Sequence, residues 1–97
     1  MSTYRLSEQA ESDLRMISKQ TIKRWGKVQA KKYIQEVHNV LITLANEPTL
    51  GREREEIFHN ARSFPVGKHI IFYRQTRLGI AVSRVLHQHM ELMGKFT

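Results

Sequence analysis

The sequence predicts an α+β fold in which a helical hairpin precedes a small antiparallel sheet. Apolar residues recur at helical spacing over two stretches that Gly26 separates. After Pro48 the sequence contains short segments rich in β-branched and aromatic residues, separated by glycines. A chain of 97 residues buries a single core, so we expect one domain over residues 1–97.

The amino-terminal part predicts a short strand followed by a helix. Residues 3–6 are β-prone, and Ser7 is placed to cap a helix whose first turns carry acidic side chains. Small or apolar side chains then line one face at helical spacing: Ala10, Leu14, Ile17 and Thr21, as far as Trp25. Gly26 can take a positive φ that ends this helix, and the next helix must then fold back.

A second helix and four β-prone segments follow. From Lys27 an apolar stripe runs to a stop before Pro48: Ala30, Tyr33, Ile34, Val37, Leu41, Leu44 and Ala45. The β-prone segments are residues 57–58, 61–66, 69–75 and 80–87. The last two are almost continuously apolar and therefore predict central strands covered on both faces. We expect the hairpin to cover one face, and residues 90–96 or a partner chain to cover the other.

The composition favours a basic cytoplasmic protein with an anionic partner. Sixteen Lys and Arg against nine Asp and Glu give a net charge of +7, which suits nucleic acid or an acidic protein surface. The same charge would also suit a basic protein that is merely soluble. There is no cysteine, which excludes disulfides and thiolate zinc sites. No apolar stretch approaches the roughly 20 residues that span a bilayer, so no membrane association is expected.

Several local strings, taken in order, resemble the ParE branch of the RelE/ParE superfamily of bacterial toxins. Their order and spacing carry the resemblance over nearly the whole chain, more than any single string does. The strings are Tyr4-Arg5-Leu6-Ser7, Ala10 with Asp13-Leu14, Trp25-Gly26 with Gln29-Ala30 and Tyr33, Leu44-Ala45 with Pro48, Gly51-Arg52, Arg62-Ser63, residues 69–74, and Arg84-Val85-Leu86-His87.

The resemblance implies a fold and a function. The fold is β-αα-βββ, with an N-terminal helical hairpin packed on a small twisted antiparallel sheet. The function is that of a toxin of a type II toxin-antitoxin system, which inhibits bacterial growth by binding DNA gyrase. A cognate ParD-like antitoxin would neutralise it in a hetero-oligomeric complex. A degenerate relative that binds antitoxin but poisons nothing is a further possibility, and direct nucleic-acid binding is left open.

The alternative function is a ribosome-dependent mRNA endonuclease of the RelE type. That chemistry needs a base, an acid and cations around the scissile phosphate, and the candidates are Arg62, Arg84 and His87. The set is incomplete because no tyrosine follows Arg84. Arg84 has a structural interpretation too, as a strand arginine paired with an acid such as Glu56 or capping the sheet edge. His87 also fits the role of a structural histidine, and His69 fits it better because it opens a buried strand. We therefore expect no catalytic residues.

The residues predicted to bind partners gather at the hairpin elbow and near the carboxyl end. We define the basic elbow as Lys19, Lys23, Arg24, Lys27, Lys31 and Lys32. A solvated face and a steering patch for gyrase or DNA are both compatible with it. Trp25, at the same elbow, falls on the apolar stripe, which predicts a core anchor rather than a stacking platform. The other candidates are Arg84, His87, Met90, Met93 and Phe96.

No metal site or cofactor is expected. His87 and His89 lie two residues apart and could share a strand face. Zinc sites need three or four ligands with supporting hydrogen bonds, and neither cysteine nor a cluster of carboxylates joins this pair.

Overall fold

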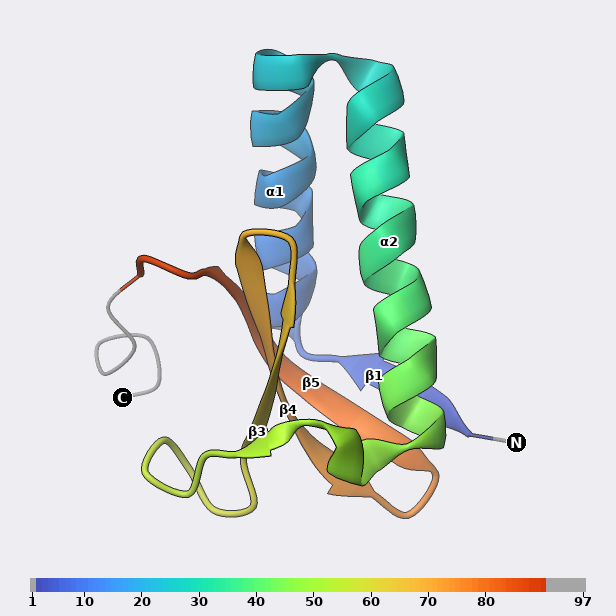
Figure 1. Cartoon of the computed structure of the whole chain (residues 1–97), viewed down its shortest axis with the longest axis vertical. Helices are drawn as coiled ribbons and strands as arrows, with labels where there is room; N and C mark the ends of the chain where they lie inside the picture. The colour runs from blue at the N-terminus through green and yellow to red at the C-terminus, as the bar shows by residue number, and fades with distance from the viewer. Residues whose placement is uncertain (1, 91–97) are drawn as a thin grey trace.

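Two antiparallel helices pack against one face of a five-stranded sheet (Figure 1). The computed structural model describes residues 2–90. The elements in chain order are β1 (Thr3–Leu6), α1 (Glu8–Trp25), α2 (Lys27–Asn46), the 3₁₀ turn η1 (Pro48–Leu50), β2 (Arg52–Glu53), β3 (Arg62–Val66), β4 (His69–Thr76) and β5 (Gly79–His87). The tip of the helical hairpin projects beyond the sheet (Figure 1).

Both ends of α1 form as the sequence predicts. The Ser7 hydroxyl oxygen accepts a hydrogen bond from the amide of Ala10 at 2.9 Å, which satisfies a free donor of the first turn. The same hydroxyl donates to the carbonyl of Ser83 at 2.7 Å, so the cap also ties the helix to β5. At the other end, Gly26 has φ 92° and its amide donates to the carbonyl of Ile22. The positive φ lets α2 begin at the next residue.

The sheet is mixed, which corrects the expectation of an antiparallel one. Its strand order is β1-β5-β4-β3-β2, and β1 runs parallel to β5, with Thr3 opposite Gly79 and Leu6 opposite Val82. The other pairs are antiparallel. The helical hairpin brings the chain back to the end of the sheet at which β1 begins (Figure 1). β5 can therefore run beside β1 in the same direction. Alternation within a strand reports burial and carries no information on the direction of the partner.

Three of the four predicted strand segments are confirmed as β3, β4 and β5. The strand predicted at residues 57–58 is wrong, because this pair lies in a turn. The amide of Arg54 donates to the carbonyl of Ala61, and the amide of Ile57 donates to the carbonyl of Arg54, so residues 54–61 close as a loop. Two apolar residues are too few to establish an alternation. The strand that does form nearby is the two-residue β2.

The core lies between the helices and the sheet. The largest buried side chains on the two sides are Val37, Leu41, Leu44, Ile71, Tyr73, Ile80, Val82 and Val85. Trp25 is not part of this core, contrary to the prediction, because 68% of its surface is exposed. The apolar stripe of α1 continues to the hairpin tip, but the sheet ends before it (Figure 1). The stripe therefore has nothing to pack on at its last turn.

The loop between β2 and β3 contributes cover on the other side of the sheet. The Arg54 guanidinium carbon lies 5.7 Å from the ring centroid of Phe72, which is fully buried, and Arg54 donates to the Ser63 hydroxyl at 3.2 Å. The prediction that residues 90–96 cover this face falls mostly outside the described residues. Met90, the one described residue of that segment, is 43% exposed.

Candidate functional site

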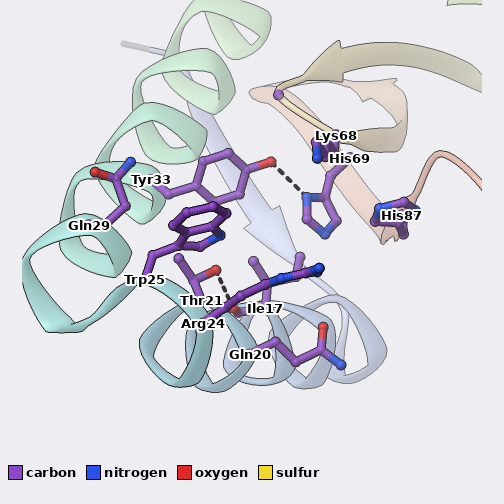
Figure 2. Close-up of a pocket in the computed structure, with 11 residues that line it drawn as sticks. Ile17, Gln20, Thr21, Arg24, Trp25, Gln29, Tyr33, Lys68, His69 and His87 are labelled. Carbon is purple, nitrogen blue, oxygen red and sulfur yellow. Dashed lines mark hydrogen bonds between the residues drawn. The ribbon is translucent and has the colours of Figure 1, made fainter.

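A groove of about 630 Å³ lies between the hairpin tip and the end of the sheet (Figure 2). Its walls come from three parts of the chain: Ile17, Gln20, Thr21, Arg24 and Trp25 of α1, Gln29 and Tyr33 of α2, and Gly67, Lys68, His69 and His87 from the β3–β4 turn and the neighbouring strands. His69 and His87 reach it together because they are directly opposite each other in the antiparallel register of β4 and β5.

Tyr33 and His69 form the hydrogen-bonded centre of the groove. The Tyr33 hydroxyl donates to the carbonyl of Val66 at 2.9 Å and lies 2.6 Å from Nδ1 of His69. A phenol carries one proton, and the Val66 carbonyl can only accept. The contact with His69 is therefore assigned as a donation from Nδ1–H to the Tyr33 oxygen. In this tautomer Nε2 of His69 is the acceptor of the ring, with no hydrogen-bond partner among residues 2–90, and Figure 2 shows this second ring nitrogen on the groove side.

Burial keeps His69 neutral. The pKa of His69 lies below its ordinary value of 6.5, first because burial disfavours the charged ring and second because His87 is close. The ring centroids of His69 and His87 are 5.4 Å apart. Burial likewise raises the pKa of Tyr33. The centre of the groove therefore offers neutral hydrogen-bonding groups at physiological pH.

The β3–β4 turn beside Tyr33 and His69 requires glycine at position 67. Gly67 has φ 55°, and a Cβ atom placed there would lie 2.6 Å from the Tyr33 ring. A larger residue would push Tyr33 out of its hydrogen bonds with Val66 and His69. Gly67 thus allows the β3–β4 turn to approach α2 closely.

The charge that lines the groove is positive. Arg24 and Lys68 are the cations in its wall, and no Asp or Glu is among the lining residues. None of the ion pairs found within residues 2–90 involves either cation. Figure 2 shows the Arg24 side chain extended along the groove. A site of this kind attracts an anionic ligand.

Arg84 lies away from this groove and is paired with Asp13, not with the expected Glu56. Its Nε and one terminal nitrogen donate to the two Asp13 carboxylate oxygens at 2.8 Å each. The hydrogen bonds that Arg84 donates to Asp13 raise the pKa of Arg84 above its ordinary value. Glu56 instead accepts from Arg54 at 2.7 Å. The structural interpretation, a strand arginine paired with an acid, therefore describes Arg84, with a different acid.

Arg62 is also engaged in structural bonds. It donates to the carbonyl of Gly51 at 2.7 Å and to that of Thr49 at 3.2 Å, which fixes the segment between η1 and β2. Arg62 is opposite Tyr73 in the sheet, whereas His87 is opposite His69. Tyr73 and His69 are four positions apart along β4, or about 13 Å. The three residues considered for a ribonuclease thus lie at separate places in the described fold.

Comparison with known proteins identifies the family. The sequence profile described as "ParE toxin of type II toxin-antitoxin system, parDE" matches residues 4–92. The chain belongs to the ParE toxin family. It is 40% identical over 92 residues to the toxin ParE1 of Mycobacterium tuberculosis, covering 94% of each chain. It is 36% identical over 90 residues to the toxin ParE1 of Caulobacter vibrioides, covering 93% of each.

A more distant relative agrees with this assignment, and a solved structure shares the fold. The chain is 30% identical over 97 residues to the toxin ParE of Escherichia coli, covering 98% of this chain and 93% of that one. Its fold resembles a chain of the structure titled "Chromosomal ParDE TA system from P. aeruginosa", with a TM-score of 0.75. That match covers 90% of this chain and 96% of the other at 18% identity. The α+β architecture is therefore that of a ParE toxin.

The basic elbow of this ParE-family chain is divided between two sides of the hairpin. Arg24 lines the groove, whereas Lys27 and Lys31 line a shallow depression beside Ile22 and His38. Lys19, Lys23 and Lys32 are exposed and line neither. The elbow is thus a charged rim around the tip and not one flat patch.

The remaining candidates are partly outside the described residues. Met90 is exposed, and Met93 and Phe96 lie beyond the described part of the chain. The His87 and His89 rings are 5.2 Å apart, but within residues 2–90 no group of three or more His, Asp or Glu side chains is arranged to hold a metal ion. In the same residues, neither helix is long and apolar enough to cross a bilayer.

Sequence reasoning missed the groove as a unit. The sequence pattern places Tyr33 on the apolar stripe and predicts a structural role for His69, and it predicts no ligand contact for Gln20, Gln29 or Lys68. The available signal was the register: a strand that begins at His69 and a partner strand that ends at His87 place both rings at one end of the sheet. That signal becomes usable only when the β4–β5 turn is fixed at residues 77–78.

Proposed function

We propose that this chain is a growth-inhibiting toxin that binds DNA gyrase and is neutralised by a cognate ParD-like antitoxin. The observation that carries the proposal is the family match over residues 4–92. Three relatives of known name are toxins, and the structural neighbour comes from a ParDE toxin-antitoxin system. The matches cover more than nine-tenths of the length of each of these proteins, so the chain corresponds to nearly the whole of each relative.

A binding mechanism without catalysis fits the residues at hand. RNA cleavage would need groups that converge on one phosphate. Here Arg62 is bonded to backbone carbonyls and Arg84 to Asp13, which leaves neither guanidinium poised toward a common point. His87 in the groove is the one remaining member of the set. This favours adhesion to gyrase over the alternative, an mRNA endonuclease of the RelE type.

The hairpin tip is the surface we assign to gyrase. It projects beyond the sheet (Figure 1) and exposes two apolar side chains, Trp25 at 68% and Val28 at 77%, in a stretch that also carries exposed lysines. Exposed apolar groups in a charged rim are typical of protein interfaces. The net charge of +7 would speed association with an acidic partner.

The decisive test is made with purified components. The protein should inhibit supercoiling by gyrase or accumulate gyrase-dependent double-strand breaks in plasmid DNA. Addition of the cognate antitoxin should reverse the effect, and topoisomerase I in the same buffer serves as the control enzyme. No effect at a large molar excess over gyrase would refute the proposal. Codon-positioned mRNA cuts in a translation extract would establish the endonuclease instead.

The antitoxin half of the proposal has its own test. Co-expression with the product of an adjacent small gene should raise the yield of dispersed protein, because a partner chain covers exposed apolar surface. Salt should slow the association of the two chains more than it speeds their dissociation. Equal yield and dispersity of the toxin alone would contradict this half and leave the gyrase assay unaffected.

A further inference from the structure

Trp25 has no structural role that accounts for its size. It is the last residue of α1, it is 68% exposed, and its indole lines the groove. Figure 2 shows the ring on the same wall as Tyr33, below the phenol. A large exposed aromatic ring beside a groove offers a flat face on which another planar group can stack.

Cations lie close to that face. Arg24 precedes Trp25 in the chain, and Lys68 lies across the groove on the β3–β4 turn. Neither forms an ion pair within residues 2–90, and no carboxylate lines the groove. Lys23 and Lys27 are exposed at the same hairpin tip, outside the groove. The preferred ligand is therefore anionic.

The remaining polar groups are neutral and suit the edge of a base. Nε2 of His69 is the acceptor of the ring, because Nδ1 donates to Tyr33. Gln20 and Gln29 add amide groups that both donate and accept. The combination of an aromatic face, mixed neutral hydrogen-bonding groups and flanking cations is that of a site for an unpaired nucleotide.

We propose that the groove binds single-stranded nucleic acid, with one base stacked on Trp25 and the adjoining phosphates on Arg24 and Lys68. A volume of about 630 Å³ falls within the range of pockets that hold small ligands, so one nucleotide fits. The base must be unpaired, since a paired base exposes no face for stacking. Lys23 and Lys27 extend the site beyond one nucleotide and favour a strand over a free mononucleotide. Binding is independent of gyrase and goes beyond the proposed function.

The chain contains one tryptophan, so its fluorescence reports on this site directly. Titration with a twelve-residue oligodeoxythymidine should quench the indole emission, and a labelled copy should give the affinity by fluorescence polarisation. Trp25→Ala should weaken binding about tenfold, as expected for the loss of one stacked base. Arg24→Ala should also weaken binding and should lower the salt dependence by about one phosphate contact.

Two matched variants control for surface and charge. Val28→Ala removes an apolar side chain outside the groove that is 77% exposed, compared with 68% for Trp25, and Arg77→Ala removes a cation at the opposite end of β4. Both should bind the oligonucleotide like the unmodified chain. Thermal melting establishes that Trp25→Ala is folded, and Trp25→Phe should recover part of the affinity because it restores a ring.

Three outcomes would overturn the proposal. A duplex of the same length that binds as tightly as the single strand, without quenching, would reduce the interaction to unspecific charge attraction. A polyglutamate peptide that binds and quenches equally would assign the groove to an acidic protein segment. Oligonucleotide binding that survives Trp25→Ala unchanged would place the contact elsewhere on the basic surface.

Discussion

Asp13 of α1 and Arg84 of β5 are joined by two hydrogen bonds of 2.8 Å, although 71 positions separate them in the chain. The same carboxylate accepts the amide of Val85 at 3.0 Å. β1 pairs with β5 only as far as Val82, so beyond that point Asp13 satisfies a backbone donor that no strand reaches. Asp13 thus positions α1 on the sheet and caps the edge of β5 beyond its pairing with β1.

The first prediction is that Asp13→Ala lowers the free energy of unfolding by about 3 kcal/mol. The two side chains are only 14% and 16% exposed, so the substitution removes the carboxylate to which a nearly buried guanidinium and the Val85 amide donate. Denaturant unfolding followed by circular dichroism measures the loss. Asp13→Asn should cost less, because its amide oxygen can still accept from Val85.

Glu36→Ala is the matched control for this prediction, since it removes an exposed carboxylate from the other helix. Its effect should stay within about 0.5 kcal/mol. A loss for Asp13→Ala no larger than that of the control would mean that the pair contributes little beyond an exposed ion pair.

The second prediction concerns Tyr73, whose fully buried hydroxyl connects β4 to η1. It donates to the carbonyl of Pro48 at 2.7 Å and accepts from the amide of Gly51 at 2.8 Å. Tyr73→Phe leaves both backbone groups without this partner and should lower the free energy of unfolding by about 1 to 3 kcal/mol. Denaturant unfolding measures it, with an unchanged m-value as the sign of intact two-state behaviour.

Tyr4→Phe provides the comparison for Tyr73. The Tyr4 hydroxyl lies 2.6 Å from Nδ1 of His38 in an exposed setting, where water can replace the lost partner. Tyr4→Phe should therefore lower the free energy of unfolding by less than about 1 kcal/mol. Equal costs for the two variants would show that burial of the Pro48 and Gly51 groups is not what makes Tyr73 important.

Most of the fold could be predicted from the sequence because its signals are local. Ser7, Gly26 and Pro48 mark helix ends by their own hydrogen-bonding and backbone preferences, and the stripes between them fix both helices. The strands from His69 and from Gly79 are long enough for their apolar runs to be decisive. The parallel neighbour of β5 was not predictable, since nothing in residues 3–6 encodes it.

The site was less predictable because it depends on where helices and sheet end relative to one another. Trp25 has the spacing of a core residue, and only the overhang of the hairpin beyond the sheet exposes it. Arg84 was expected to need an acid, but Asp13 becomes its partner only once α1 is placed beside β5. Pairings of this kind arise from tertiary packing and leave no local pattern.

The third prediction tests the basic elbow as a steering surface. Lys23→Glu combined with Lys27→Glu should slow association with an acidic antitoxin or with gyrase about tenfold at low salt, and the deficit should shrink as salt rises. Surface plasmon resonance at several ionic strengths measures the rates. Arg74→Glu with Arg77→Glu changes the net charge equally at the far end of the sheet and is the matched control.

A specific role for the elbow requires the two double variants to differ. Equal slowing by both would mean that net charge alone sets the association rate. Faster dissociation without slower association would assign the lysines to direct contacts instead of steering.

The fourth prediction is a loss of stability in mild acid caused by His69. Because its pKa lies below 6.5 in the folded chain, the unfolded chain binds a proton more readily. The free energy of unfolding should therefore fall as the pH drops below about 6.5, until the folded-state pKa is passed. A proton on His69 would face His87 beside it, with Arg24 and Lys68 also in the groove wall and no groove-lining carboxylate to offset them.

Thermal melting between pH 7.5 and 5.5 measures this dependence above the range in which most carboxylates titrate. His69→Gln should flatten the slope, because its amide can still hydrogen-bond Tyr33 but takes up no proton. His59→Gln, a change at a side chain 86% exposed on the β2–β3 loop, should keep the slope of the unmodified chain. If His69→Gln instead retains the full slope, the acid sensitivity belongs to another group and burial of His69 has no energetic consequence.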